Sequence, residues 1–199
     1  MPRQRQNPDT RDRLLEAGVA AFLENGYHGA GLKEVLDRVQ VPKGSFYNYF
    51  KSKEEFGAAT IRHYANSLSQ KMAGAMAGAR DPLSGLRRFF HRLMADFEAA
   101  DYVGGCLVAN LGGEVELNQT CRLALAEALY DWRAGVTQAL RQAQEQGQVR
   151  NDIAAEELAD VLINTWEGAV IRMKIERSLA PLRQCLHRLL DDYFQPVAG

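Results

Sequence analysis

The sequence predicts an all-α protein with about nine helices. Apolar residues recur with helical spacing along most of the chain, and no segment shows the strict alternation that predicts a half-buried strand. Glycine and proline interrupt this pattern at intervals typical of helix lengths. The chain has 199 residues, of which 46% are hydrophobic, so it can bury a substantial core.

The predicted helices are bounded by residues that cap or break helices. Asp9 or Thr10 can cap the first helix, and Gly26 ends it. Asp81 can cap the fifth helix, with Pro82 at its first helical position. The helices are expected to begin near residues 9, 31, 42, 53, 82, 106, 118, 154 and 182.

The charge is unevenly distributed along the chain. The whole sequence has 24 Lys and Arg against 25 Asp and Glu, for a net charge of −1. Residues 1–53 hold 9 of the basic and 6 of the acidic residues, which leaves 15 and 19 for residues 54–199. A modestly basic N-terminal segment followed by an acidic remainder is consistent with a small phosphate-binding module joined to a domain that does not bind nucleic acid.

Residues 31–53 combine two short helices with a three-residue turn, which is the helix-turn-helix arrangement of many DNA-binding proteins. The run PKGSFYNYFKSK mixes cationic, hydroxyl, amide and aromatic side chains that can contact phosphates and base edges. Phe46 and Phe50, four residues apart, can anchor its inner face. The same pattern also fits a structural helical hairpin with solvated lysines. The side chains left for outward contact are Lys43, Ser45, Tyr47 and Tyr49.

The stretch GLKEVLDRVQVPKGSFYNYFKSKEEF resembles the helix-turn-helix of TetR-family transcriptional repressors, and the preceding ENGYHGAGL also resembles this family. The resemblance covers about residues 10–60. It implies that the second helix of the motif contacts the operator and that the start of the next helix contacts a phosphate. Tyr49 stands where many members have His. The residues for which the resemblance implies DNA contact are Lys33, Pro42, Lys43, Gly44, Ser45, Tyr47, Tyr49 and Lys53.

The same resemblance implies the organisation of the whole chain. Residues 1–55 are expected to form the helix-turn-helix DNA-binding domain, and residues 56–199 a helical domain for ligand sensing and dimerisation. The implied partners are double-stranded operator DNA, a second copy of the chain and a small-molecule or electrophilic inducer. In such a dimer, two recognition helices about one DNA turn apart, ~34 Å, read a palindrome together.

Broad apolar faces on the two C-terminal helices predict a dimer interface. A four-helix bundle across a two-fold axis would bury these faces, as in TetR-like proteins, although the same residues could form core within one chain. The interface is expected to include Leu158, Leu162, Leu186, Leu189, Leu190 and Phe194. An apolar ligand pocket is expected to be lined by Phe89, Leu93, Phe97, Trp132 and Trp166.

Cys106 is a candidate sensing residue. It follows Gly104-Gly105 at a predicted helix start, where backbone N–H groups and the helix dipole favour a thiolate. The segment GCLVANLGGEV resembles a TetR subfamily of the N-ethylmaleimide-reductase repressor type, associated with electrophile- and oxidant-responsive control, and Lys174 lines up with the pattern of that subfamily. A buried thiol that only packs in the core or lines a pocket is the alternative. Cys121 and Cys185 are expected in the core.

The sequence gives little support to other classes of protein. The histidines lack the spacing of a zinc site, no dinucleotide fingerprint or nucleophile motif occurs, and we expect neither an enzyme nor a cofactor or metal. No apolar run reaches the roughly 20 residues of a membrane span, and we expect a cytoplasmic protein. We expect a repressor released from a palindromic operator by a small molecule, or by an electrophile or oxidant acting at Cys106. The alternatives are a TetR-like repressor with a non-covalent apolar pocket and a helical interaction protein that does not bind DNA.

Overall fold

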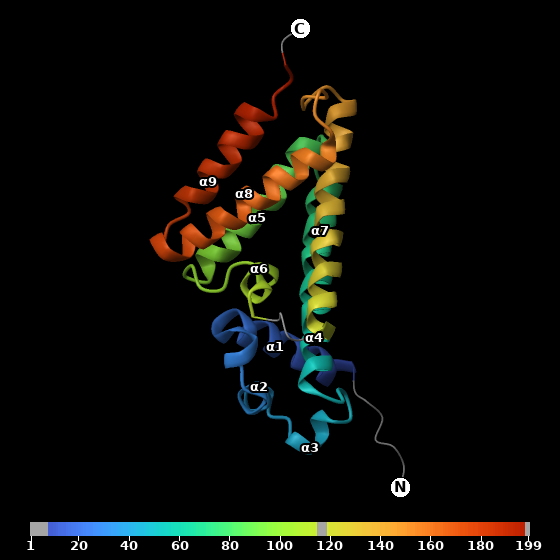
Figure 1. Ribbon diagram of the computed structural model, residues 1–199, viewed down its shortest axis with the longest axis vertical. Coiled ribbons are helices and arrows are strands. Elements are labelled where there is room, and N and C mark those ends of the chain that lie inside the picture. The colour runs from blue at the N-terminus through green and yellow to red at the C-terminus, as the bar shows by residue number, and fades with distance from the viewer. Residues whose placement is uncertain (1–7, 115–118, 198–199) are drawn as a thin grey trace. The chain divides into compact units, whose positions relative to one another are not determined.

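The computed structural model describes residues 8–114 and 119–197, and within these ranges it contains helices and no strands. The predicted all-α class is therefore confirmed (Figure 1). The α-helices are α1 (Pro8–Gly29), α2 (Leu32–Val39), α3 (Lys43–Phe46), α4 (Lys53–Ala77), α5 (Pro82–Ala99), α6 (Leu107–Gly112), α7 (Gln119–Glu145), α8 (Ala155–Glu176) and α9 (Ala180–Leu186). A π-helical segment, His187–Tyr193, continues α9.

The described residues fall into two compact units that are not continuous in sequence. The first unit comprises residues up to Asn66 together with Cys106–Ala128. The second unit comprises Ser67–Gly105 together with Leu129 onward. Two of the three divisions fall inside α4 and inside α7, and the third falls between Gly105 and Cys106, just before α6.

The helix boundaries agree with the sequence at two predicted positions. Asp81 caps α5 as predicted, because its carboxylate accepts a 2.8 Å hydrogen bond from the Ser84 N–H. The two hydrogen bonds from Ser84 lower the pKa of Asp81 to about 2. Gly26 has φ +71° and ψ 179°, which are not helical, so the first helical stretch ends there as predicted, and a second, short stretch of α1 runs on to Gly29 across this kink.

Aromatic packing holds α3 in the first unit. The rings of Phe46 and Phe50 lie 5.5 and 5.1 Å from the Phe56 ring of α4, and Phe22 of α1 lies 6.0 Å from Phe56 on another side. The α-helical part of the predicted 42–49 helix is only four residues long, which is too short to be stable alone. Its conformation therefore depends on the burial of Phe46 and Phe50.

The second unit is a helical bundle with a core of leucines and aromatic residues. Trp166 of α8 is buried, and its ring lies 4.6 Å from Phe90 and 6.4 Å from Phe97 of α5. Arg133 of α7 donates two hydrogen bonds to the Asp160 carboxylate of α8, at 2.5 and 2.8 Å. Among the described residues, no helix has the length and apolar character needed to cross a bilayer.

Candidate DNA-binding surface

The turn between α2 and α3 is fixed by backbone hydrogen bonds. Gln40 has left-handed backbone angles, and its N–H bonds to the carbonyls of the last turn of α2. The Val41 N–H donates to the Leu36 carbonyl at 3.0 Å, and the Ser45 N–H donates to the Pro42 carbonyl at 2.8 Å. These bonds end α2 and begin α3 within three residues, as a helix-turn-helix requires.

The side chains of α3 and of the turn that follows it, up to Phe50, separate into a buried set and an exposed set. Phe46 is fully buried and Phe50 is 2% exposed, whereas Tyr47, between them, is 52% exposed. Ser45 and Tyr49 are half-buried. Pro42, Lys43 and Gly44 are exposed at the start of the helix.

The start of α3 leaves room for a partner to approach closely. A Cβ atom added to Gly44 would meet no described atom of the protein within 4 Å. The packing of the described residues therefore does not require glycine here, and the position suits close approach of an external backbone.

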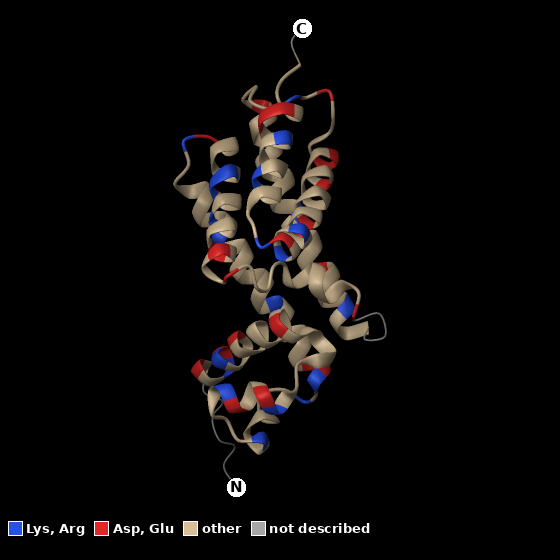
Figure 2. Cartoon of the chain, turned by 90° about the vertical axis from the view of Figure 1, so that its left-hand side faces the viewer, with Lys and Arg blue, Asp and Glu red and all other residues tan. Residues whose placement is uncertain are grey.

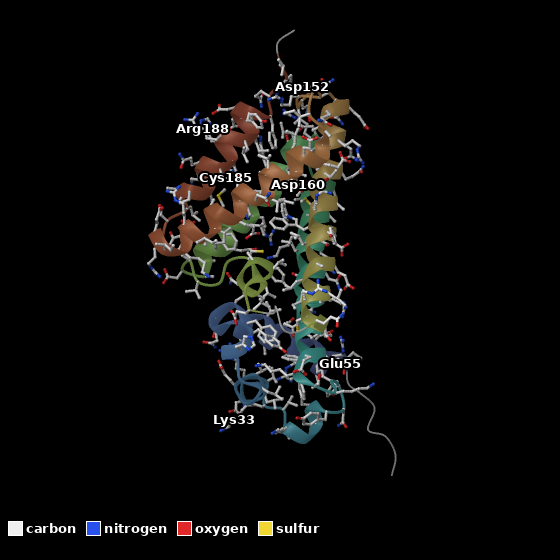
Figure 3. The ribbon with its side chains drawn as sticks, viewed as in Figure 1. Lys33, Glu55, Asp152, Asp160, Cys185 and Arg188 are labelled. Atoms are coloured by element: carbon white, nitrogen blue, oxygen red, sulfur yellow. The ribbon has the colours of Figure 1, made fainter. Side chains whose placement is uncertain are left out.

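The lysines of this surface differ in how they are held. Lys33 on α2 and Lys43 on α3 are exposed and form no ion pair within the described part of the chain. Figure 3 shows the side chain of Lys33 directed away from the ribbon. Lys53 is half-buried, and its Nζ lies 4.9 Å from the centre of the Tyr27 ring.

Arg38 of α2 is committed to internal ion pairs. Its guanidinium lies 2.5 Å from the Glu24 carboxylate and 2.6 Å from that of Glu34. The hydrogen bond from Arg38 lowers the pKa of Glu24. Figure 2 shows acidic and basic residues interspersed in the helices nearest the N-terminus. The free cations of α2 and α3 are therefore Lys33 and Lys43 among the residues that the structure describes.

A capping arrangement that the sequence analysis missed fixes Lys53 at the start of α4. The Ser52 hydroxyl accepts from the Glu55 N–H at 3.2 Å, and the Glu55 carboxylate, labelled in Figure 3, accepts from the Lys51 N–H at 2.8 Å. The pattern Ser-x-x-Glu is a known signal for a helix N-terminus and is readable in the sequence.

Arg11 is a second residue that the sequence analysis missed. Its guanidinium lies over the Phe50 ring, 5.4 Å from the ring centre, and the residue is exposed. It thus brings a cation of α1 to the edge of α3. No local sequence signal indicates this position, because the contact joins residues 39 positions apart in the chain.

Cys106 precedes the first residue of α6 and is 5% exposed. Its carbonyl accepts from the Asn110 N–H at 2.9 Å, but its side chain makes no capping hydrogen bond. Lys174 is exposed in the last turn of α8. The stem of Lys174 packs against Gly105, where a Cβ would lie 3.3 Å from the lysine Cδ.

The other two cysteines are buried, as predicted. Burial raises the pKa of the Cys185 thiol to about 11. Burial also raises the pKa of the Cys121 thiol, although a hydrogen bond with Tyr27 acts in the opposite direction. Both thiols are therefore protonated at neutral pH and are poor nucleophiles.

The residues expected to line a pocket are all buried in the second unit. Trp132 stands out among them, because its Nε1–H is buried and has no hydrogen-bond partner among the described residues. Leaving such a donor unsatisfied costs about 1–3 kcal/mol.

The residues expected at a dimer interface are buried within the single chain, and none is more than 8% exposed. Their side chains pack within the second unit, which fits the alternative of a core within one chain. The apolar residues that α8 leaves accessible are Val161, Ile171 and Ile175, the last of which is 77% exposed.

Comparison with known proteins gives consistent matches over most of the chain. Residues 14–60 match the family described as "Bacterial regulatory proteins, tetR family", and residues 82–189 match the domain "Tetracyclin repressor-like, C-terminal domain". The chain is 35% identical to the HTH-type transcriptional repressor DhaR of Mycobacterium sp. (strain GP1), over 88% of each chain.

A second relative is the HTH-type transcriptional repressor NemR of Escherichia coli (strain K12), which is 36% identical over 89% of this chain and 90% of the relative. The crystal structure of the reduced form of E. coli NemR superposes with a TM-score of 0.84 at 31% identity, covering 92% of this chain and 96% of the other. Both the sequence and the arrangement of helices are thus shared over nearly the full length.

Proposed function

Because the chain belongs to the TetR family of bacterial regulatory proteins, it is a DNA-binding transcriptional regulator and not an enzyme, and we propose that it represses transcription as a homodimer on a palindromic operator. The observation that carries the proposal is the division of α3 and the turn after it into anchoring and exposed residues. Phe46 and Phe50 hold the helix, while Lys43 and Tyr47 face solvent. The two named repressors among its relatives support the direction of control.

In this proposal the exposed face of the helix-turn-helix meets DNA. Lys33, Lys43 and Lys53 neutralise phosphates, which makes binding strongly dependent on salt. Ser45, Tyr47 and Tyr49 face base edges, where each good contact contributes about 1–3 kcal/mol of discrimination. Pro42 and Gly44 form the corner that allows the backbone to approach the DNA closely.

The proposed dimer places two such surfaces on one operator. Regulators of the TetR family act as dimers, and an isologous interface brings the same patch of each copy together. Val161, Ile171 and Ile175 are the accessible apolar residues of α8 and support a contact along this helix. The interface is thus made of these residues and not of the buried leucines beneath them.

The signal that releases the DNA is proposed to be an electrophile or oxidant acting at Cys106. The position of this residue immediately before α6, where the backbone N–H groups of the first helical turn lie, supports the proposal. Lys174, the other residue proposed for sensing on the resemblance, is exposed in the last turn of α8. The similarity to NemR, which is solved in a reduced form, supports a redox-responsive thiol. Modification would act by favouring a dimer that no longer matches the operator.

A non-covalent ligand is the second candidate signal. The unsatisfied Nε1–H of Trp132 favours it, because a ligand with a hydrogen-bond acceptor would satisfy this buried donor. The apolar side chains of Phe89, Leu93, Phe97 and Trp166 would then contact the rest of the molecule. The two candidates predict different results, because a response to a non-covalent ligand should persist when Cys106 is replaced.

The test measures binding of the purified protein to the DNA upstream of its own gene, with and without N-ethylmaleimide. We expect specific binding by the wild type that N-ethylmaleimide abolishes, and binding by Cys106→Ala that resists the reagent. Cys185→Ala is the matched control and should respond as the wild type does. Loss of binding in Cys106→Ala as well would favour another cysteine, and a response to apolar ligands alone would favour the pocket. Absence of specific binding would favour a helical interaction protein.

A further inference from the structure

We propose that Glu114, His28 and Tyr27 form a link through which the segment after α6 sets the position of Lys53. The inference rests on the proposed role of Lys53 as a phosphate contact and adds a means by which that contact is controlled. All four residues belong to the first unit. Tyr27, His28 and Glu114 act here as positioning residues.

The end of the link at Lys53 is the face of the Tyr27 ring. The ammonium lies 4.9 Å from the ring centre, within the range of a cation–π interaction. Tyr27 is 4% exposed, and its ring lies 5.6 Å from that of Phe22. The ring is therefore a fixed support for a lysine side chain that is otherwise free to adopt many rotamers.

Tyr27 is also tied to the first turn of α4. A Cβ added to Gly57 would lie 2.7 Å from the Tyr27 ring and 2.8 Å from the Cys121 sulfur, so the three residues are in close contact. The Cys121 thiol donates to the Glu54 carbonyl at 3.6 Å and hydrogen-bonds with Tyr27. The backbone next to Lys53 and the ring under its ammonium are thus held by one cluster.

The other end of the link is Glu114. Its carboxylate accepts from the His28 N–H at 3.2 Å, and its carbonyl accepts from the His28 ring Nε2 at 2.7 Å, so this nitrogen carries a proton. The His28 ring meets the Tyr27 ring edge to face, with centres 5.4 Å apart. Gly26 permits this placement of the Glu114 carboxylate, because a Cβ at position 26 would overlap it.

Glu114 belongs to the chain segment that continues α6. Its N–H donates to the Leu111 carbonyl at 3.0 Å, and Leu111 is buried in the core of the first unit. A displacement of α6 along its axis therefore moves Glu114, and with it the backbone on both sides of Tyr27. The consequence is a change in where the Lys53 ammonium is held, without any change in α3 itself.

The first test follows acylation of Lys53 in the full-length protein without DNA, using an N-hydroxysuccinimide ester and mass spectrometry. Glu114→Ala should raise the acylation rate of Lys53 by about two- to fivefold, which corresponds to the loss of one exposed cation–π contact. Lys33 and Lys43 should react at unchanged rates and serve as internal controls. Glu114→Gln keeps an acceptor for the His28 N–H and should restore most of the protection. An unchanged rate at Lys53 would overturn the link.

The second test is a double-mutant cycle on DNA affinity. Lys53→Gln should weaken binding and lower its salt dependence. Glu114→Ala should weaken binding when residue 53 is lysine and have no further effect when residue 53 is glutamine. Additive effects of the two substitutions would overturn the link. If the wild type binds no specific DNA, the proposed function fails, while the acylation test still decides the link.

Discussion

Replacing Lys43 by glutamine removes one positive charge from each recognition surface. Lys43 is the first residue of α3, is exposed and forms no ion pair in the described ranges. A dimer on a palindrome loses two phosphate contacts, so the slope of log K against log salt concentration should decrease in magnitude by about 1.8, at 0.9 per contact. A fourfold rise in salt should then weaken the variant about 12-fold less than it weakens the wild type.

Fluorescence anisotropy on a labelled operator duplex, repeated at several salt concentrations, measures this slope. Lys71→Gln is the matched control, because Lys71 of α4 pairs with Asp96 of α5 in the second unit, 2.5 Å away. Its slope should equal that of the wild type. An unchanged slope for Lys43→Gln would refute the phosphate contact, and a decrease of about 0.9 would indicate that only one protomer makes it.

Three further predictions test the scaffold and the thiols. Phe46→Ala should lower the free energy of unfolding by about 3–5 kcal/mol in urea titrations, whereas Tyr47→Ala should change it by less than about 0.5 kcal/mol while weakening DNA binding. Asp81→Ala should cost about 1 kcal/mol at pH 7, and Asp81→Asn much less. Because the folded pKa of Asp81 is lowered to about 2, its stabilisation is present above the unfolded pKa and is lost as the pH falls from about 4 to 2, which acid titration of the variants can check. With a pKa raised to about 11, Cys185 should be alkylated far more slowly at pH 7 than after unfolding, as mass spectrometry of N-ethylmaleimide adducts can measure.

The sequence was sufficient to predict the helix-turn-helix because its signals are local. The spacing of Phe46 and Phe50 indicates which side of the segment is buried, and the structure buries both. Ser52 and Glu55 carry an equally local signal that fixes the start of α4, although it was overlooked. Residues within one or two turns of each other thus reveal their relation through spacing alone.

Contacts between distant parts of the chain could not be predicted in this way. His28 and Glu114 are 86 positions apart, and neither residue type indicates the other. An apolar helix face likewise indicates burial but not the surface that buries it. The leucines of α8, α9 and the π-helical segment therefore fit either a partner subunit or an intrachain core in pattern, and the structure adds that Leu158 and Leu190 are buried within one chain.

The division of α3 and the turn after it into anchoring and exposed side chains has a consequence for how operator preference can diverge. Phe46 and Phe50 carry most of the folding contribution of the segment, whereas Lys43 and Gly44 are exposed, and Tyr47 is 52% exposed with its ring packed edge to face against Phe46. Substitutions at the exposed positions can therefore accumulate with little loss of stability. Duplicated copies of such a gene can acquire new target sites one residue at a time, and a designer can screen libraries at the same three positions on an unchanged scaffold.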